Sequence, residues 1–240
     1  MRIVKILIKK ELSNALNSWT LYVGLMVFFC ICGFYCWMSD AGVFAHDLAS
    51  MTPCFNVIKW IFIFILPAFA MRSIAEEKRY GTLEFLLTKP IRTNQLIAGK
   101  FLTLVAFVII ILILTLPYYF TMIYLGDTDS GQALCGYMGL LLAGTAYGSI
   151  SLFSSSVSRN SISAFLLGFI LILIFQFFFG MISEITNNYI LSEIFLYLSI
   201  DEHLDPLLRG IVDSRDLIYF LSLSAIFLFL TRMSIVKMRY

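Results

Sequence analysis

The residues of this chain that could do chemistry are few, and their spacing favours binding over catalysis. The nearest approach to an ATP-binding loop, residues 94–101, has Asn in place of the first glycine and Phe in place of the magnesium-binding Ser or Thr. Neither HExxH nor GxSxG occurs. Both histidines, His46 and His203, fall outside the apolar runs, so no histidine base lies beside a nucleophile at membrane depth. The sequence therefore predicts a chain that is no enzyme and holds no cofactor of its own.

The cysteines show no metal-ligand spacing, and we expect no metal site. All of them lie in or beside apolar runs, where a free cysteine behaves as a small apolar residue. That is the role we expect for them. A disulfide within a group of three near the outer face is the alternative. The five cysteines are Cys30, Cys32, Cys36, Cys54 and Cys135, and the group is Cys32, Cys36 and Cys54.

One dense block of charge interrupts the apolar sequence, at residues 72–90 with the sequence RSIAEEKRYGTLEFLLTKP. Residues 72–80 can continue the preceding helix beyond the membrane, and Gly81 permits a bend. A short helix over residues 82–88 would begin with Thr82 as its cap and stop before Pro90. The order of these signals predicts a rigid, bent helical segment just outside the membrane, which we call the charged segment.

The composition places the rest of the chain in a membrane. Hydrophobic residues make up 60% of the 240 residues and charged residues 13%, whereas a soluble domain is roughly 45–50% apolar. A helix needs about 20 apolar residues to cross a bilayer. Extending the two shorter apolar runs gives an all-α chain of one domain, residues 1–240, with six transmembrane helices. The predicted spans are 19–38, 53–73, 98–125, 132–157, 161–183 and 214–236.

Basic residues are distributed unevenly between the two sides. Fourteen of the 17 Lys and Arg residues lie before the first span, between residues 72 and 100, at Arg159, or at the C-terminus. Cytoplasmic loops carry the excess of Lys and Arg. The charge pattern therefore predicts a multi-pass protein of the inner membrane, with both termini and the charged segment in the cytoplasm.

Two further segments are too short or too polar to cross the membrane as a helix. Residues 2–17 form an amphipathic pattern suited to the cytoplasmic interface, although a simple basic flank that fixes topology is the alternative. The middle of the longest external segment, residues 189–200, is apolar but too short to span. We expect it to form a re-entrant or interfacial helix.

Three polar or small-residue features lie within the predicted spans. Lys59 and Gln176 are functional candidates because polar groups at membrane depth are costly. For Lys59, extension of the side chain to the outer interface is the alternative. The fourth span is rich in small residues, including the pair Gly144 and Gly148, a spacing that allows close helix packing. We expect internal packing there, with a subunit interface or substrate path as alternatives.

The run IAEEKRYGTLEFLLTKPI at residues 74–91, followed by NQLIAGK, resembles the permease subunits of ABC-2-type transporters. TPCFNVIKWIFIFILPAFAMRS at residues 52–73 and HLDPLLRGIVDSRDLIYF at residues 203–220 extend the resemblance over nearly the whole chain. Within the family, the chain looks most like the gliding-motility-associated permease of the Bacteroidetes type.

The resemblance implies a fold and a set of partners. The fold has an N-terminal elbow helix, a cytoplasmic coupling helix in the charged segment and a re-entrant outer hairpin. The partners are a second permease copy and two separate ATPase subunits that hold ATP and magnesium. The gliding-motility type is associated with a further membrane-anchored subunit that has a large external domain. Candidate contacts to the ATPase are Glu76, Glu77, Lys78, Arg79, Gly81, Thr82, Glu84, Thr88 and Lys89.

These observations favour an ATP-driven permease in the lipid bilayer, with no nucleic-acid partner. The alternative is a membrane anchor for a motility or secretion machine that moves no solute. A secondary transporter is disfavoured because the spans carry neither an inverted repeat nor an inward-facing acidic residue for ion coupling. For the charged segment itself, the alternative is a solvated loop that only fixes topology.

Overall fold

The computed structural model describes residues 2–38, 51–82, 93–126, 128–186 and 188–237. Within these ranges every regular element is a helix, as predicted. Six helical stretches are long and apolar enough to cross a membrane. They are α2 (Trp19–Met38), α4 (Thr52–Ala70), α7 (Thr93–Leu125), α8 (Ser130–Val157), the continuous run of α9 (Ser161–Leu173), η1 (Ile174–Phe178) and α10 (Phe179–Ile185), and α13 (Ser214–Lys237).

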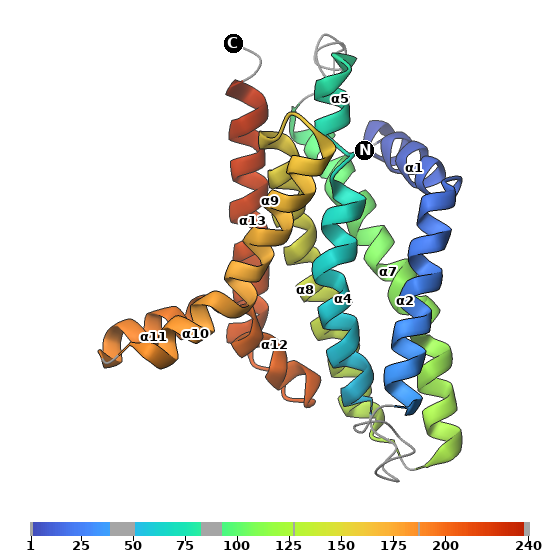
Figure 1. Ribbon diagram of the computed structural model, residues 1–240, viewed down its shortest axis with the longest axis vertical. Helices are drawn as coiled ribbons and strands as arrows, with labels where there is room; N and C mark the ends of the chain where they lie inside the picture. The colour runs from blue at the N-terminus through green and yellow to red at the C-terminus, as the bar shows by residue number, and fades with distance from the viewer. Residues whose placement is uncertain (1, 39–50, 83–92, 127, 187, 238–240) are drawn as a thin grey trace.

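The remaining helices are shorter and lie at the ends of the bundle. They are α1 (Arg2–Leu16), α5 (Ala75–Arg79), α11 (Tyr189–Leu198) and α12 (Ile200–Leu208). Figure 1 shows α1 and α5 at the same end as the last turns of α13, which we call the α5 end. The opposite end, where α12 lies beside the first half of α8, we call the α12 end. Helix α11 has no buried residue, and with α10 it projects sideways from the bundle (Figure 1).

Helix α8 is the centre of the bundle, and its small residues allow this. It contacts α4, α7, α9, α12 and α13. A Cβ atom added at Gly139 would lie 2.9 Å from Leu207 of α12, and one at Gly144 would lie 2.7 Å from Val108 of α7. Both distances are too short for real contacts. These glycines therefore serve internal packing, as the sequence indicated.

The prediction that residues 72–80 continue the second span as one helix is wrong. Helix α4 ends at Ala70, a turn follows, and α5 begins at Ala75. The reason is Ser155 of α8, whose Oγ accepts hydrogen bonds from the backbone N–H groups of Ile74 and Ala75, both at 3.1 Å. A side chain from another helix thus satisfies donors that would otherwise be orphaned where a new helix starts.

Replacing Ser155 with alanine should therefore loosen α5. Two buried N–H groups would lose their acceptor, and we expect the free energy of unfolding to fall by about 1–3 kcal/mol. Reversible unfolding in mixed detergent micelles, followed by circular dichroism, measures this loss. Ser156→Ala is the matched control, because the Ser156 hydroxyl donates only to the Phe153 carbonyl of its own helix. Equal losses in the two variants would contradict the assigned role of Ser155.

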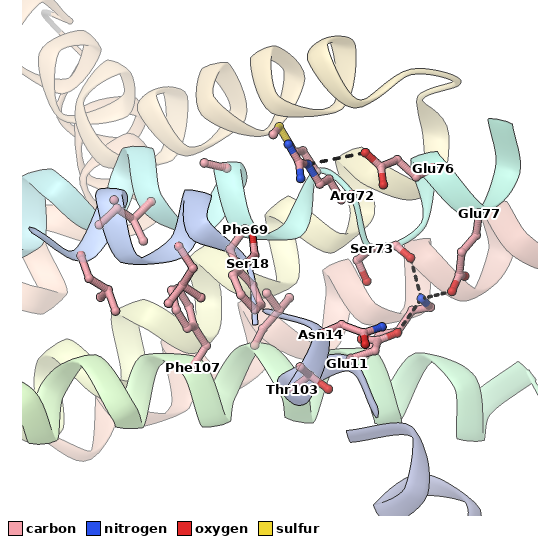
Figure 2. A pocket seen from close by; sticks show the side chains of 18 of the residues that line it. Glu11, Asn14, Ser18, Phe69, Arg72, Ser73, Glu76, Glu77, Thr103 and Phe107 are labelled. Atoms are coloured by element: carbon pink, nitrogen blue, oxygen red, sulfur yellow. Dashed lines mark hydrogen bonds and ion pairs between the residues drawn. The ribbon is translucent and has the colours of Figure 1, made fainter. Parts of the chain in front are cut away.

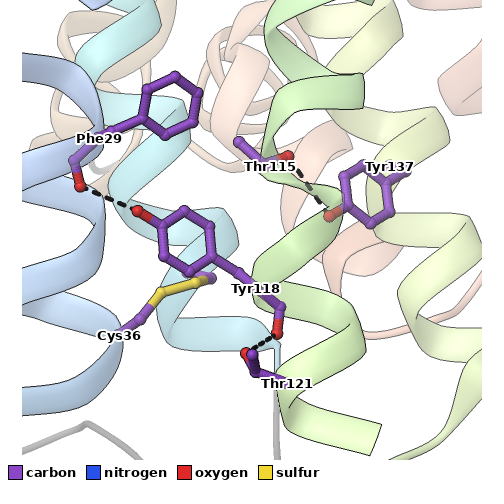
Figure 3. The surroundings of a disulfide bond; sticks show 7 residues. Phe29, Cys36, Thr115, Tyr118, Thr121 and Tyr137 are labelled. Atoms are coloured by element: carbon purple, nitrogen blue, oxygen red, sulfur yellow. Dashed lines mark hydrogen bonds between the residues drawn. A yellow bond between two sulfur atoms is a disulfide. The ribbon is translucent and has the colours of Figure 1, made fainter. Parts of the chain in front are cut away.

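Helices α2 and α4 are joined by a disulfide near the α12 end (Figure 3). It links Cys36 and Cys54, whose Cα atoms are 5.2 Å apart. The expectation that all cysteines are small apolar residues is therefore wrong for this pair, because the packing of the two spans brings their Cβ atoms within bridging reach. It holds for Cys32, which is buried, whereas Cys30 is exposed. Beside the disulfide, the Tyr118 hydroxyl of α7 donates to the Phe29 carbonyl of α2 at 3.0 Å.

Candidate functional site

A buried lysine ties three elements together at the α5 end. The Lys100 side chain is fully buried in α7, and its Nζ lies 2.8 Å from Glu11 Oε1 of α1 and 2.9 Å from Glu77 Oε1 of α5. It also donates to the Ser73 carbonyl, 2.5 Å away in the turn before α5. Figure 2 shows these side chains converging. An ammonium has three donors, so all of them are used. We call Glu11, Ser73, Glu77 and Lys100 the Lys100 cluster.

Helix α5 has further attachments to the bundle. Lys78 Nζ lies 3.4 Å from the Ser156 carbonyl and 3.5 Å from the Val157 carbonyl, at the C-terminus of α8. Glu76 pairs with Arg72 at 3.5 Å and accepts a hydrogen bond from the Ser161 hydroxyl at the start of α9. Cations at a helix C-terminus are favourable because its carbonyls carry partial negative charge. Helix α5 is thus held by α7, α8 and α9, and Lys100 links it indirectly to α1.

The predicted ATPase contacts fall into three groups. Glu76, Glu77 and Lys78 hold their charged groups against other helices of the same chain. The exposed residues are Arg79, Gly81 and Thr82. Gly81 adopts the left-handed conformation with φ 69°, so the predicted bend is present there. Outside the described residues lie Glu84, Thr88, Lys89 and most of the predicted short helix.

Sequence reasoning missed the Lys100 cluster. In the charge distribution, Lys100 was only one of the basic residues predicted to be cytoplasmic. Glu11 was not singled out. One signal was available, because Glu11 is the only acidic residue before position 40, in a helix otherwise rich in lysine. A lone carboxylate among cations on an amphipathic helix is a candidate for a buried partner. Its actual partner, 89 positions away in sequence, carries no local sign of the pairing.

A pocket of about 550 Å³ lies directly beside the Lys100 cluster. Helices α1, α2, α4, α5 and α7, the turn before α5 and the residues just after it form its walls. Figure 2 shows the polar side chains at one end, including Arg72 and Glu76, and aromatic rings such as Phe107 at the other. The pocket therefore has an ionic end at the bundle terminus and an apolar end within the spans.

A second polar cluster lies towards the α12 end, with a buried lysine and partly exposed carboxylates. Lys59 of α4 lies 2.6 Å from Asp201 and 3.2 Å from Asp205, both on α12. Asp201 also accepts a hydrogen bond from Gln176 Nε2 at 2.7 Å, and the Tyr147 hydroxyl of α8 donates to Gln176 Oε1. We call these five residues the Lys59 cluster. The structure thus brings together the two intramembrane candidates, and the Lys59 side chain, only 7% exposed, ends at the partly exposed acids of α12.

The position of Gln176 depends on a local change in helix type. Residues Ile174–Phe178 form one π-helical turn, which widens the backbone between α9 and α10. Such turns are frequent at functional sites. The Gln176 carbonyl accepts from the Ser199 hydroxyl at 3.3 Å, just before α12. The π-helical turn therefore meets α12 through both its backbone and its side chain.

Helix α12 has a second buried attachment. His203 Nδ1 lies 2.8 Å from Asp216 of α13, and its Nε2 lies 3.1 Å from the Tyr197 carbonyl. The ring stacks on Tyr219 with centroids 4.1 Å apart. The attachment of α12 to Lys59 had a local signal, because Asp201 and Asp205 are four residues apart and share one helix face.

The charged helix after the second span and the six candidate spans fall within one known family profile. The sequence profile described as "ABC-2 family transporter protein" matches residues 5–236. The chain belongs to the ABC-2 transporter family. A comparison with curated proteins finds no match.

As an ABC-2 family member, the chain is a multi-pass membrane protein and the membrane component of an ABC transporter. Family membership implies pairing with an ABC ATPase subunit. The resemblance inferred from residues 74–91 is thus confirmed at the level of the ABC-2 family. The gliding-motility subtype stays a prediction, because the matching profile describes the ABC-2 family as a whole.

Proposed function

We propose that this ABC-2 permease couples ATP hydrolysis by its separate ATPase to a change in its own helical bundle, and that α5 receives the force. The observation that carries the proposal is the attachment of α5 on several sides. Buried polar contacts join it to α1 and α7 through Lys100, and to α8 through Ser155. Arg79 and Tyr80, at its far end, are exposed.

This arrangement suits a helix that transmits force from the ATPase to the spans, and not one that only binds the ATPase. A short helix fixed to three others moves with them as one body, so a push at its exposed end reaches the spans. Rigid-body switching between two packed states is the usual way in which such a push becomes a conformational change. ATP can bias the bundle only through contacts that differ between those states. The exposed end of α5 would supply such contacts.

We further propose that the α5 end faces the cytoplasm and that the membrane is the inner membrane. Two independent features support this orientation. Most Lys and Arg residues belong to that end, in agreement with the positive-inside rule. The Cys36–Cys54 disulfide lies near the opposite end, and disulfides persist in oxidising compartments such as the periplasm. Both termini would then be cytoplasmic.

The assembly we propose contains two permease copies and two ATPase subunits that bind ATP and magnesium. A link to gliding motility or secretion, with an accessory subunit carrying a large external domain, remains a prediction from the resemblance alone. An anchor that moves no solute would use the same ATPase contact. The two functions differ in whether ATP moves the bundle.

The exposed end of α5 provides the test. We expect Arg79→Glu combined with Tyr80→Ala to reduce the ABC ATPase isolated with the tagged chain from native membranes by about tenfold or more, since central interface residues contribute 2 kcal/mol or more. Mass spectrometry of the ATPase peptides measures the amount. Charge reversal at Glu202, exposed on α12, is the control and should change nothing. Undiminished ATPase in the α5 variant would overturn the proposed contact.

A second measurement separates a moving permease from a static anchor. Spin labels at Arg159→Cys and Glu202→Cys, in a chain with the other free cysteines replaced, report the distance between exposed points at opposite ends of the bundle. We expect ATP to shift this distance in the isolated complex. A distance that ATP leaves unchanged would favour the anchor.

A further inference from the structure

A groove between the third and the last spans has apolar walls and one polar end. Helices α7 and α13 contact each other, and the groove between them has a volume of about 400 Å³. That volume falls within the roughly 300–1,000 Å³ that is usual for small-molecule sites. Phe101 and Leu102 of α7 and Leu228 and Phe229 of α13 line its apolar part. We call this space the α7–α13 groove.

The apolar part of the groove faces the lipid bilayer. Both helices are long and apolar enough to cross a membrane. Leu102 is 43% exposed and Phe229 is 57% exposed. Lipid tails are as apolar as such side chains, so exposed apolar residues on a spanning helix are in contact with acyl chains. A lipid is therefore the molecule best placed to enter the groove.

The polar end of the groove is formed by Asn94 and Arg232, which are both exposed. Asn94 is the second residue of α7, at the α5 end. Arg232 lies between the uncharged run 217–231 and the last turn of α13, at the same end of the bundle. An arginine near the end of a spanning helix extends its charged group to the membrane interface. Both polar side chains thus lie where lipid head groups are.

The charge at this end favours an anionic head group. Among the residues that the structure describes, none forms an ion pair or a hydrogen bond with Arg232. No carboxylate lines the groove. A guanidinium matches a phosphate with two parallel hydrogen bonds. A head group that also carries an ammonium would find no carboxylate partner in the groove, so a head with a phosphate and no cation is preferred.

We propose that the α7–α13 groove is a binding site for an anionic phospholipid. The Arg232 guanidinium and the Asn94 amide donate to its phosphate, and one acyl chain lies along the apolar walls between α7 and α13. Phosphatidylglycerol has the required chemistry, because its head holds the phosphate charge and no cation. Binding involves this chain and the bilayer alone, so it does not depend on the proposed ATPase contact.

Two pairs of variants separate the groove from the rest of the surface. Arg232→Gln removes the guanidinium, and its control is Lys237→Gln, which removes another exposed cation of α13 that does not line the groove. Ala98→Phe places a ring in the groove, because Ala98 lines it. The control for this variant is Ala225→Phe, at an exposed position of α13 outside the groove.

The test is photolabelling of the purified full chain in phosphatidylcholine nanodiscs. Two probes carry the same diazirine on one acyl chain and are added at the same low mole fraction, one with a phosphatidylglycerol head and one with a phosphatidylcholine head. Mass spectrometry gives the labelling by each probe at Leu102 and Phe229. We expect the phosphatidylglycerol probe to label about fivefold more, which corresponds to about 1 kcal/mol. Arg232→Gln and Ala98→Phe should make the two probes label equally, and their controls should keep the difference.

Three results would overturn the proposal. Equal labelling by the two probes in the unaltered chain would mean that any bilayer lipid fills the groove. A preference for phosphatidylglycerol that Arg232→Gln leaves intact would mean that the basic end of the bundle attracts anionic lipids without a site. No labelling by either probe would mean that protein, such as a second copy of this chain, covers the groove.

Discussion

Removing both acidic partners of Lys59 is expected to lower the free energy of unfolding by about 3 kcal/mol, the lower end of the usual cost of breaking a buried pair, because the side chains of Asp201 and Asp205 are 34% and 44% exposed. The variant is Asp201→Asn combined with Asp205→Asn. The Lys59 side chain itself is only 7% exposed, so most of it would stay out of contact with water after its partners lose their charge. Unfolding in mixed detergent micelles measures the loss. Hydrogen exchange should show the increased opening at α12, which remains joined to α13 through His203 and Asp216.

Two further variants make this result specific to the Lys59 cluster. Glu202→Gln removes a charge from the same helix at an exposed position, and we expect it to cost less than about 1 kcal/mol. Adding Lys59→Met to the double variant removes the stranded charge and should restore most of the lost stability. If the triple variant were as unstable as the double one, the loss would come from α12 itself and not from Lys59.

Replacing Lys100 with methionine is expected to cost about 3 kcal/mol, at the lower end of the range for a broken buried pair. Two carboxylates and a backbone carbonyl lose their shared donor. The estimate is at the lower end because the side chains of Glu11 and Glu77 are 22% and 24% exposed and reach some water. We also expect faster hydrogen exchange in α5 and in α1, because both lose their tie to α7.

Lys78→Met is the control for this prediction. It removes a lysine from the same region, but the Lys78 ammonium lies 3.4 Å and 3.5 Å from its carbonyl partners and is partly exposed. We expect a loss below about 1 kcal/mol. Substituting Glu11 and Glu77 with glutamine in the Lys100→Met chain should recover part of the stability. An unchanged α5 exchange rate in Lys100→Met would contradict the role given to the cluster.

The spans could be predicted from the sequence because their signal is local. Each one is a run of apolar residues long enough to cross a bilayer, and neighbouring residues suffice to recognise it. The predicted span 161–183 and the observed stretch Ser161–Ile185, for example, begin at the same residue. Gly81 was predictable for the same reason, since a glycine between two helix signals marks a bend whatever the rest of the fold does.

The polar clusters were not predictable, because each contact is set by packing between distant segments. Lys59 and Asp201 are 142 positions apart, and Lys100 and Glu11 are 89 apart. The sequence showed that Lys59 and Gln176 are unusual at membrane depth, but nothing local to either residue pairs it with Asp201, which joins them. The break before α5 was missed for the same reason, because the acceptor that permits it is Ser155 on another helix.

The disulfide between α2 and α4 also determines how these two helices can separate. It joins them near one end, whereas the pocket beside the Lys100 cluster lies between them at the other, against Leu21 and Leu25 of α2 and Ile65 and Phe69 of α4. The covalent bond therefore keeps the two helices together near the α12 end, so that their separation is largest at the α5 end. Helix α2 has 20 residues, which makes a lever of about 30 Å. A rotation of about 10° on such a lever widens the far end by about 5 Å, roughly the separation of neighbouring side chains on a helix face.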